Sequence, residues 1–199
     1  MSSEYNGGLT REQFLFYEMR VLASLIVGGL SDEEAINKIV SENLFQFPTE
    51  RMLKTVASGC MRRIRALDNY SLLNELATGS FDVAKQINLY AMMKQNKIVW
   101  DFMITVIGEK YRTQDYEFSN KDLNVFMLRL CEQNDDVGKW SEATLNKIKQ
   151  VLRKCLVECD YLDNARSIKL NTIYISPELE AGIVENNDQI VFPAFNYFK

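Results

Sequence analysis

The sequence predicts an all-α fold, a compact globule of helices with helix-turn-helix-like elements. Apolar residues recur every three to four positions through most of the 199 residues, and Ser, Thr or Asn precedes several of these stretches. Period-two alternation is confined to one short region near 168–175, with Ile168, Leu170, Ile173 and Ile175 among polar residues. That region allows at most a minor β-hairpin wing.

Six helices are expected in the first part of the chain, at about 11–27, 32–43, 49–67, 70–77, 81–94 and 98–111. Gly28 and the glycine after it end the first helix. Ser31 and Glu34 form a capping box at the start of the second. Pro48 keeps the chain extended before Thr49 caps the third helix, so helices two and three resemble a helix-turn-helix in outline.

A polar stretch at 113–120 predicts a domain boundary, which separates an N-terminal helical subdomain (1–114) from a C-terminal winged-helix-like subdomain (115–199). In the second subdomain, Ser119 or Asn120 caps a helix that runs through Asn134, and 135–138 forms a turn. Ser141 caps a helix that ends at about residue 160, and Pro177 opens a final short helix. A helix, a basic helix and a β-like stretch follow in the order found in winged-helix domains. Only the first few residues and the last dozen are candidates for disorder.

Composition excludes several classes of function. The chain contains no histidine, the commonest general base and metal ligand, and it lacks the glycine motifs that bind nucleotide phosphates. No pair of carboxylates stands out for catalysis. The four cysteines, Cys60, Cys131, Cys155 and Cys159, form no C-x-x-C pair and are expected to be buried thiols. A redox or metal pair of Cys155 and Cys159 is the alternative, but no other soft ligand lies near it in the sequence. We therefore expect no enzyme activity, no metal, no cofactor and no small-molecule substrate.

The most apolar run, Val21 to Leu30, is about half of the roughly 20 residues that span a bilayer. It is interpreted as a core helix, which predicts a cytoplasmic protein without membrane association. The net charge of -4 gives the chain no overall attraction to nucleic acid. Any such attraction must therefore come from a local patch.

The helix expected over 49–67 has a one-sided charge distribution. Helical geometry places Arg51, Lys54, Arg62 and Arg65 within an arc of roughly 80° opposite the apolar face. With Arg63, the window from 51 to 65 holds five cations and no carboxylate, whereas a solvated face normally mixes both signs. A bound polyanion would relieve this repulsion, and arginine forks readily onto phosphate. The alternative is an outer face whose counter-charges come from another part of the fold.

The helix expected over 141–160 carries the second group of cations. They are Lys147, Lys149, Arg153 and Lys154, and Asn146 and Gln150 accompany them. The window from 139 to 154 contains five cations and one carboxylate. Amides beside cations suit contacts to the edges of bases in a DNA groove. A solvated outer face is the alternative here too.

Four stretches of the chain, in this order, resemble the BrxA family, the small core proteins of bacterial BREX phage-exclusion systems. They are GLTREQFLFYEMRVLASLIVGGLS, FPTERMLKTVASGCMRRIRAL, ATGSFDVAKQINLYAMMKQNKIVWDFMITVIGEKY and WSEATLNKIKQVLRKCLVECDYL. The resemblance runs from about Leu9 to about Pro177. It implies an all-helical protein with helix-turn-helix-like elements, DNA-binding surfaces and no enzyme activity, which works beside other BREX subunits that carry the methyltransferase and ATPase parts.

We therefore expect a non-enzymatic DNA-binding component of a phage-defence system. Its expected partners are double-stranded DNA, contacted mainly through phosphates with weak sequence preference, and other BREX subunits. The eight expected contact residues are Arg51, Lys54, Arg62, Arg65, Lys147, Lys149, Arg153 and Lys154. The alternative is a protein-interaction scaffold whose basic helices meet acidic partner surfaces. A steep loss of nucleic-acid affinity with salt distinguishes the first hypothesis from the second.

Overall fold

The computed structural model describes residues 5–11 and 13–198, and within them the chain forms helices and no β-strand. The elements are η1 (Gly7–Thr10), α1 (Phe16–Val27), α2 (Asp32–Ser41), α3 (Glu50–Leu67), α4 (Tyr70–Thr78), α5 (Phe81–Gln95), α6 (Lys97–Phe102), η2 (Met103–Gly108), α7 (Glu109–Arg112), α8 (Asn120–Gln133), α9 (Asp135–Gly138), α10 (Glu142–Glu158), α11 (Pro177–Glu185) and η3 (Gln189–Phe195). The predicted all-α fold class is confirmed.

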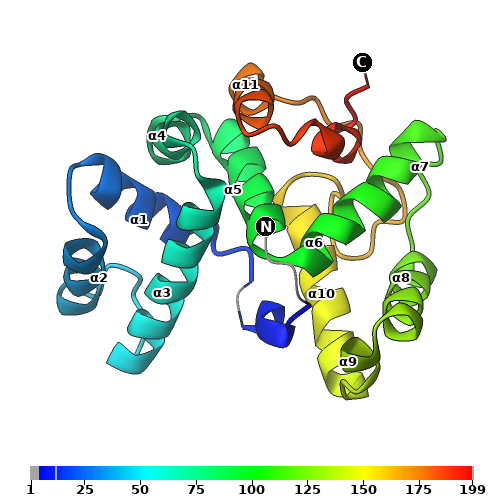
Figure 1. The fold of residues 1–199 in the computed structure, drawn as a ribbon, viewed down its shortest axis with the longest axis horizontal. Helices are drawn as coiled ribbons and strands as arrows, with labels where there is room; N and C mark the ends of the chain where they lie inside the picture. The colour runs from blue at the N-terminus through cyan, green and yellow to red at the C-terminus, as the bar shows by residue number, and fades with distance from the viewer. Residues whose placement is uncertain (1–4, 12, 199) are drawn as a thin grey trace.

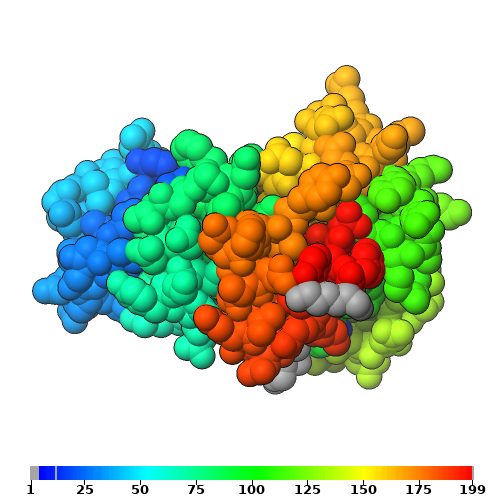
Figure 2. Space-filling model, turned by 90° about the horizontal axis from the view of Figure 1, so that it is seen from above, coloured from blue at the N-terminus to red at the C-terminus, as the bar shows by residue number. Residues whose placement is uncertain are grey.

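The helices are arranged along one long axis (Figure 1). Helices α1, α2 and α3 form one end, α4 and α5 lie in the middle, and α6 to α10 form the other end. The C-terminal segment lies across one side, where α11 packs on α4 and α5 and η3 packs on η2 and α7 (Figure 2). The buried apolar side chains of these helices form one hydrophobic core.

Local capping signals locate most helix starts correctly. Ser31 and Glu34 form the predicted capping box, and the Thr49 hydroxyl accepts a hydrogen bond from the Met52 N–H at 3.3 Å. The Ser141 hydroxyl accepts one from the Thr144 N–H at 3.2 Å. These caps act within one helical turn, which is why the sequence alone predicts them.

The first long helix begins at Phe16, later than the predicted start at residue 11. Leu15 has a left-handed backbone conformation, with φ of 50°, and interrupts the helical path. The Phe14 carbonyl accepts hydrogen bonds from Arg63 Nη1 at 2.7 Å and Asn88 Nδ2 at 2.8 Å. Because side chains from α3 and α5 donate hydrogen bonds to this carbonyl, it cannot accept a hydrogen bond within a helix. These tertiary contacts therefore keep the residues before Phe16 out of α1. Position 12 of the predicted helix lies outside the described residues.

The helix expected over 98–111 spans α6, η2 and α7, and its middle is π-helical, from Met103 to Gly108. A π-turn inserts an extra residue per turn and is usually found where packing or function requires it. Here Gly108 lies against η3, where an added Cβ would sit 3.0 Å from the Pro193 Cβ. The close approach of η3 therefore supplies a structural reason for part of this distortion.

The extended stretch near 168–175 forms no hairpin within the described residues. It contributes an isolated antiparallel bridge between Lys169 and Glu117. The Leu170 N–H donates to the Tyr116 carbonyl at 2.8 Å, so this stretch pairs with the linker that precedes α8. The extended conformation was predicted, but its partner lies about fifty positions away and no local signal identifies it.

Two other expectations are corrected. Residues 135–138, expected as a turn, form the short helix α9. The last dozen residues, a candidate for disorder, include η3, whose Val191 and Phe195 side chains are buried. Apolar side chains spaced along η3 account for this docking.

The two predicted subdomains share contacts. η1 packs against α10 across the proposed boundary, and Leu9 within it is buried. The helix-turn-helix outline of α2 and α3 is present as a packed pair, joined by residues 42–49, a longer connection than the usual three to four residues. The division at residue 114 and the helix-turn-helix assignment both stay predictions.

The cysteines differ in one respect from expectation. Cys60, Cys155 and Cys159 are buried, whereas Cys131 is half-buried. Burial raises the pKa of Cys155 to about 12 and that of Cys159 well above its usual value, so both are thiols at neutral pH.

In the described part of the chain, no group of three or more potential ligands could hold a metal ion. None of the helices in that part is long and apolar enough to cross a membrane.

Candidate functional site

The predicted basic face of α3 is exposed to solvent. Arg51, Lys54, Arg62 and Arg65 are all exposed and lie opposite the buried residues of the helix, which include Leu53 and Cys60. Arg63, the fifth cation of the window from 51 to 65, does not belong to this exposed face, because it is buried and only 1% exposed. Its guanidinium donates hydrogen bonds to the Gln13 and Phe14 carbonyls, so it serves the core and not the surface.

Within the described residues, at least two of the exposed α3 cations have carboxylate partners that the window from 51 to 65 does not contain. Lys54 pairs with Glu50 one turn earlier on α3. Arg65 forms a forked pair with Asp32 of α2, with Nε 2.9 Å from Oδ2. Among the described residues, Arg51 has no carboxylate partner. The alternative of counter-charges from elsewhere in the fold therefore applies to part of this face.

The four predicted cations of α10 divide into two groups. Lys149 and Arg153 face α8, where Lys149 Nζ donates to Asn124 Oδ1 at 2.8 Å. Lys147 and Lys154 lie more than a third of a turn around the helix from that pair, and Lys154 Nζ donates to Gln13 Oε1 at 3.1 Å. The exposed basic surface of α10 therefore continues from α8 towards the N-terminal segment.

Arg153 is fixed by the backbone of the loop after α10. Its Nε donates to the Ala165 carbonyl at 2.7 Å and its Nη2 to the Ser167 carbonyl at 2.6 Å. The guanidinium also lies 5.5 Å from the centre of the Phe118 ring. It keeps its positive charge, but most of its donors are already used, so it is a fixed cation with an additional structural role.

A groove of about 410 Å³ lies between α8 and α10. Its described lining consists of Asn120, Leu123, Asn124, Asn146, Lys149, Gln150 and Arg153. These residues provide two cations, four amides and no carboxylate. The groove is therefore a region of positive charge that is rich in hydrogen-bonding groups. It contrasts with the chain as a whole, whose net charge is negative.

Sequence reasoning identified the α10 side of this groove and missed the α8 side. Asn120 and Asn124 were not predicted as contact residues, although their spacing places them on one face of a helix. That spacing was the available signal, but only the packing of α8 beside α10 shows which face meets the cations. The structure brings α10 residues together with α8; contact of any of these residues with DNA stays a prediction.

Comparison with known proteins identifies the family. The BrxA family model matches residues 3–187. The protein "BREX protein BrxA" of Bacillus cereus is 32% identical over 182 residues, which cover 92% of this chain and 89% of that protein. The protein of the same name from Escherichia coli is 25% identical over 175 residues, covering 88% of this chain and 82% of that protein.

A solved structure shares the fold. The crystal structure of an uncharacterized protein from Magnetospirillum magneticum superimposes with a TM-score of 0.81, at 22% identity, over 96% of this chain and 97% of that one. At this identity the similarity concerns the fold alone. Since the family model spans most of the chain and one relative exceeds 30% identity over most of its length, the chain belongs to the BrxA family.

Proposed function

We propose that this protein is a non-enzymatic, cytoplasmic, DNA-binding component of a bacterial BREX phage-defence system. The groove between α8 and α10 carries the proposal, because its described lining residues include cations and amides and no carboxylate. The BREX part of the proposal is supported by the names of the relatives, which are BREX proteins. Other BREX subunits are the proposed protein partners.

Contacts to phosphate are expected to dominate. The cations Lys147, Lys149 and Lys154 project from α10 away from its buried residues, over an arc of roughly 160°. Asn146 and Gln150 are exposed and are the side chains best placed to reach base edges. Because phosphate contacts set affinity and base contacts set sequence, this composition favours double-stranded DNA with weak sequence preference.

The α3 face is expected to contribute less than α10. DNA must displace Glu50 from Lys54 and Asp32 from Arg65 before either cation is fully available. Exposed ion pairs of this kind are weak, so they reduce the contribution of α3 without abolishing it.

The proposal is tested by duplex binding of purified protein, with two unrelated sequences at several salt concentrations. Lys147→Ala/Lys149→Ala is expected to weaken binding to both sequences equally and to reduce the salt slope by about 0.9 for each phosphate that the variant no longer neutralises. Arg51→Ala/Arg62→Ala should have a smaller effect of the same kind. Arg153 is left intact, because removing it would also release the 165–167 loop.

A matched control removes two exposed cations outside both basic groups, Arg112→Ala/Lys169→Ala, and changes the net charge by the same amount. It should bind DNA like the unaltered protein. If both test variants keep the affinity and salt slope of this control, the basic helices do not bind DNA. The scaffold function, in which these helices meet acidic surfaces of other subunits, would then replace the proposal.

A further inference from the structure

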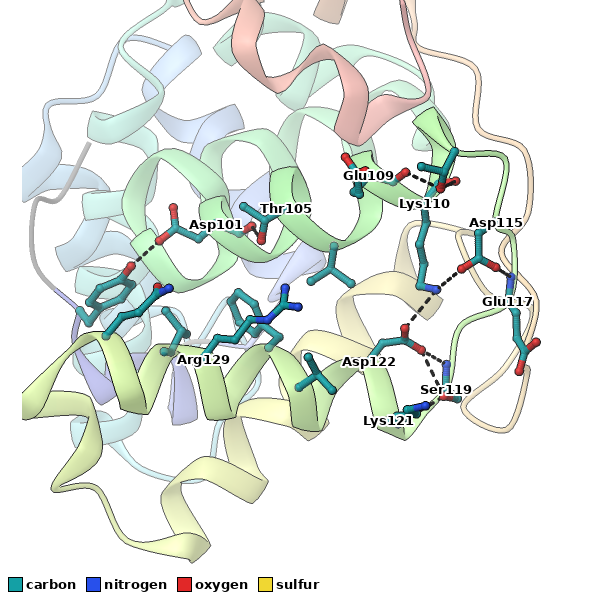
Figure 3. Close-up of a pocket in the computed structure, with 17 residues that line it drawn as sticks. Asp101, Thr105, Glu109, Lys110, Asp115, Glu117, Ser119, Lys121, Asp122 and Arg129 are labelled. Atoms are coloured by element: carbon teal, nitrogen blue, oxygen red, sulfur yellow. Dashed lines mark hydrogen bonds and ion pairs between the residues drawn. The ribbon is translucent and has the colours of Figure 1, made fainter.

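A second groove, of about 620 Å³, lies between α8 and the helical run from Lys97 to Arg112 (Figure 3). This groove opens on a different side of α8 from the basic groove. Residues 125 and 129, which line it, lie well over a quarter turn around the helix from residues 120 and 124, which line the basic groove. The two helices stand apart along this groove, and side chains from both of them line the space between them (Figure 3). The groove therefore forms a separate site.

One end of the groove is closed by the N-terminal segment. The Tyr5 hydroxyl donates a hydrogen bond to Asp101 Oδ2 at 2.6 Å. Lys97 Nζ lies 3.2 Å from the same carboxylate oxygen and 4.9 Å from the centre of the Tyr5 ring. These contacts neutralise Asp101 and block the groove at this end.

The other end is closed by an ion-paired cluster. Lys110 Nζ lies 2.9 Å from Asp115 Oδ2 and 3.0 Å from Asp122 Oδ1, and its side chain is largely buried (Figure 3). Between the two closed ends the groove is only a few helical turns long. This length suits a compact ligand better than a through-running helix of another protein.

The middle of the groove is lined by apolar side chains and by an exposed cation. Val106, Val125, Phe126 and Leu130 are among its lining residues; Val125 is exposed, whereas Phe126 and Leu130 are buried and belong to the hydrophobic core. Arg129 is exposed and extends from α8 into the space between the helices (Figure 3). Among the residues the structure describes, no carboxylate pairs with it. A positive group above an apolar surface is the arrangement that binds organic anions.

The remaining carboxylates of the groove do not oppose an anion beside Arg129. Glu109 is held in a forked pair by Arg112, at 2.8 and 2.9 Å, and this hydrogen bonding lowers the pKa of Glu109. Glu117 lies at the end of the groove that holds the Lys110 cluster, where its N–H donates to Asp115 Oδ1 at 3.1 Å (Figure 3). Arg129 is therefore the charge that a ligand in the middle would meet.

The π-helical segment independently points to the same place. Thr105 and Val106, both within Met103–Gly108, line the groove, and Thr105 lies across it from Arg129 (Figure 3). π-turns inside α-helices are frequently found at functional sites. Packing of η3 explains the buried side of this segment, around Gly108, but not the side exposed to the groove.

We propose that this groove binds a compact organic anion, with the negative group on Arg129 and an apolar body on Val125, Phe126 and Leu130. The volume lies in the range of ordinary ligand pockets, about 300–1,000 Å³. Arginine binds sulfonate, carboxylate or phosphate oxygens through two parallel N–H groups. The proposal does not depend on DNA binding, because the groove uses another face of α8.

The test uses two dyes with similar apolar bodies, anilinonaphthalene sulfonate, which is an anion, and phenylnaphthylamine, which is not. The sulfonate is expected to bind saturably at one site per chain. Arg129→Ala should weaken its binding by at least about tenfold, the contribution of one charge-assisted hydrogen bond. Arg129→Lys should restore part of the affinity, and phenylnaphthylamine should bind all three proteins equally.

Arg166→Ala removes another exposed arginine and is the matched control; it should bind the sulfonate like the unaltered protein. Absence of saturable sulfonate binding, or unchanged binding to Arg129→Ala, would overturn the proposal. Equal losses for the two dyes would also overturn it, because they would show that only the shape of the groove had changed. DNA binding by Arg129→Ala should be normal, so failure of this proposal is distinguishable from failure of the proposed function.

Discussion

Replacing the buried Arg63 by methionine should destabilise the protein by about 4 kcal/mol, a magnitude set by the buried acceptors it leaves without a donor. Methionine keeps most of the side-chain volume, so the change removes the guanidinium while leaving little cavity. Arg63 donates to the Gln13 carbonyl at 2.9 Å, to Asn88 Oδ1 at 3.3 Å and to Gln95 Oε1 at 3.1 Å. The Phe14 carbonyl also loses a donor but keeps Asn88.

The expected magnitude follows from the acceptors that lose their donor. A buried acceptor without a donor costs about 1–3 kcal/mol. The Gln13 carbonyl and the amide oxygen of Asn88 are the two most affected, so the loss lies in a range of about 2–6 kcal/mol. For a chain of this length, each kcal/mol lowers the melting temperature by about 2–4 °C, so the midpoint should fall by roughly 10 °C.

The assay is urea unfolding followed by far-ultraviolet circular dichroism, with thermal unfolding as a second measurement. Arg51→Met makes the same substitution at an exposed position of the same helix and should change stability by no more than about 0.5 kcal/mol. A loss of less than about 1 kcal/mol for Arg63→Met would refute the reasoning, because it falls below the cost of even one unsatisfied buried acceptor. It would mean that the surrounding acceptors find water or other donors at little cost.

Three further predictions concern the packing and the polar clusters. Gly182→Ala should cost about 1–3 kcal/mol in urea unfolding, because the added Cβ would overlap the buried Leu72 side chain; an unchanged midpoint would show that α11 shifts freely. Phe195→Ala should cost about 3–5 kcal/mol, since this fully buried side chain anchors η3, and a negligible loss would indicate a detachable C-terminal segment. Burial opposes ionisation of Asp122, but hydrogen bonds from the Ser119 N–H and from Lys110 outweigh it and lower the pKa. Its folded-state pKa is therefore below the unfolded value of about 3.9, so its stabilising contribution is present above that value and is lost as the pH falls further. Unfolding free energies measured across acidic pH should decline there for the unaltered protein, with a smaller decline for Lys110→Met; identical profiles would contradict this assignment.

The basic helices show how far sequence reasoning reaches towards a site. The period of α3 correctly placed Arg51 and Arg62 opposite the apolar face, because that placement depends only on helical geometry. The same reasoning could not show that Arg63 is buried among backbone carbonyls, or that Asp32 of a neighbouring helix pairs with Arg65. Both facts involve residues more than thirty positions apart.

The two grooves illustrate the same limit. Asn120 and Asn124 become part of the basic groove only because α8 packs beside α10. Arg129 has no sequence signal of its own. It becomes a candidate ligand contact only because it lines the groove between α8 and the helix that contains the π-turn. The sequence lists the groups available to each groove, but the packing of helices decides which groups meet.

The sequence by itself determined the all-α class, most helix starts and the family resemblance. Hydrophobic period, caps and glycine stops act over one or two turns, so local physical chemistry is enough to specify them. Only the tertiary structure decided where α1 begins, which cations stay exposed, and that residues 189–195 dock onto the core. In each of these cases the deciding partner is a side chain or a carbonyl on a distant segment. Its position is set by the packing of the whole chain, which no local pattern encodes.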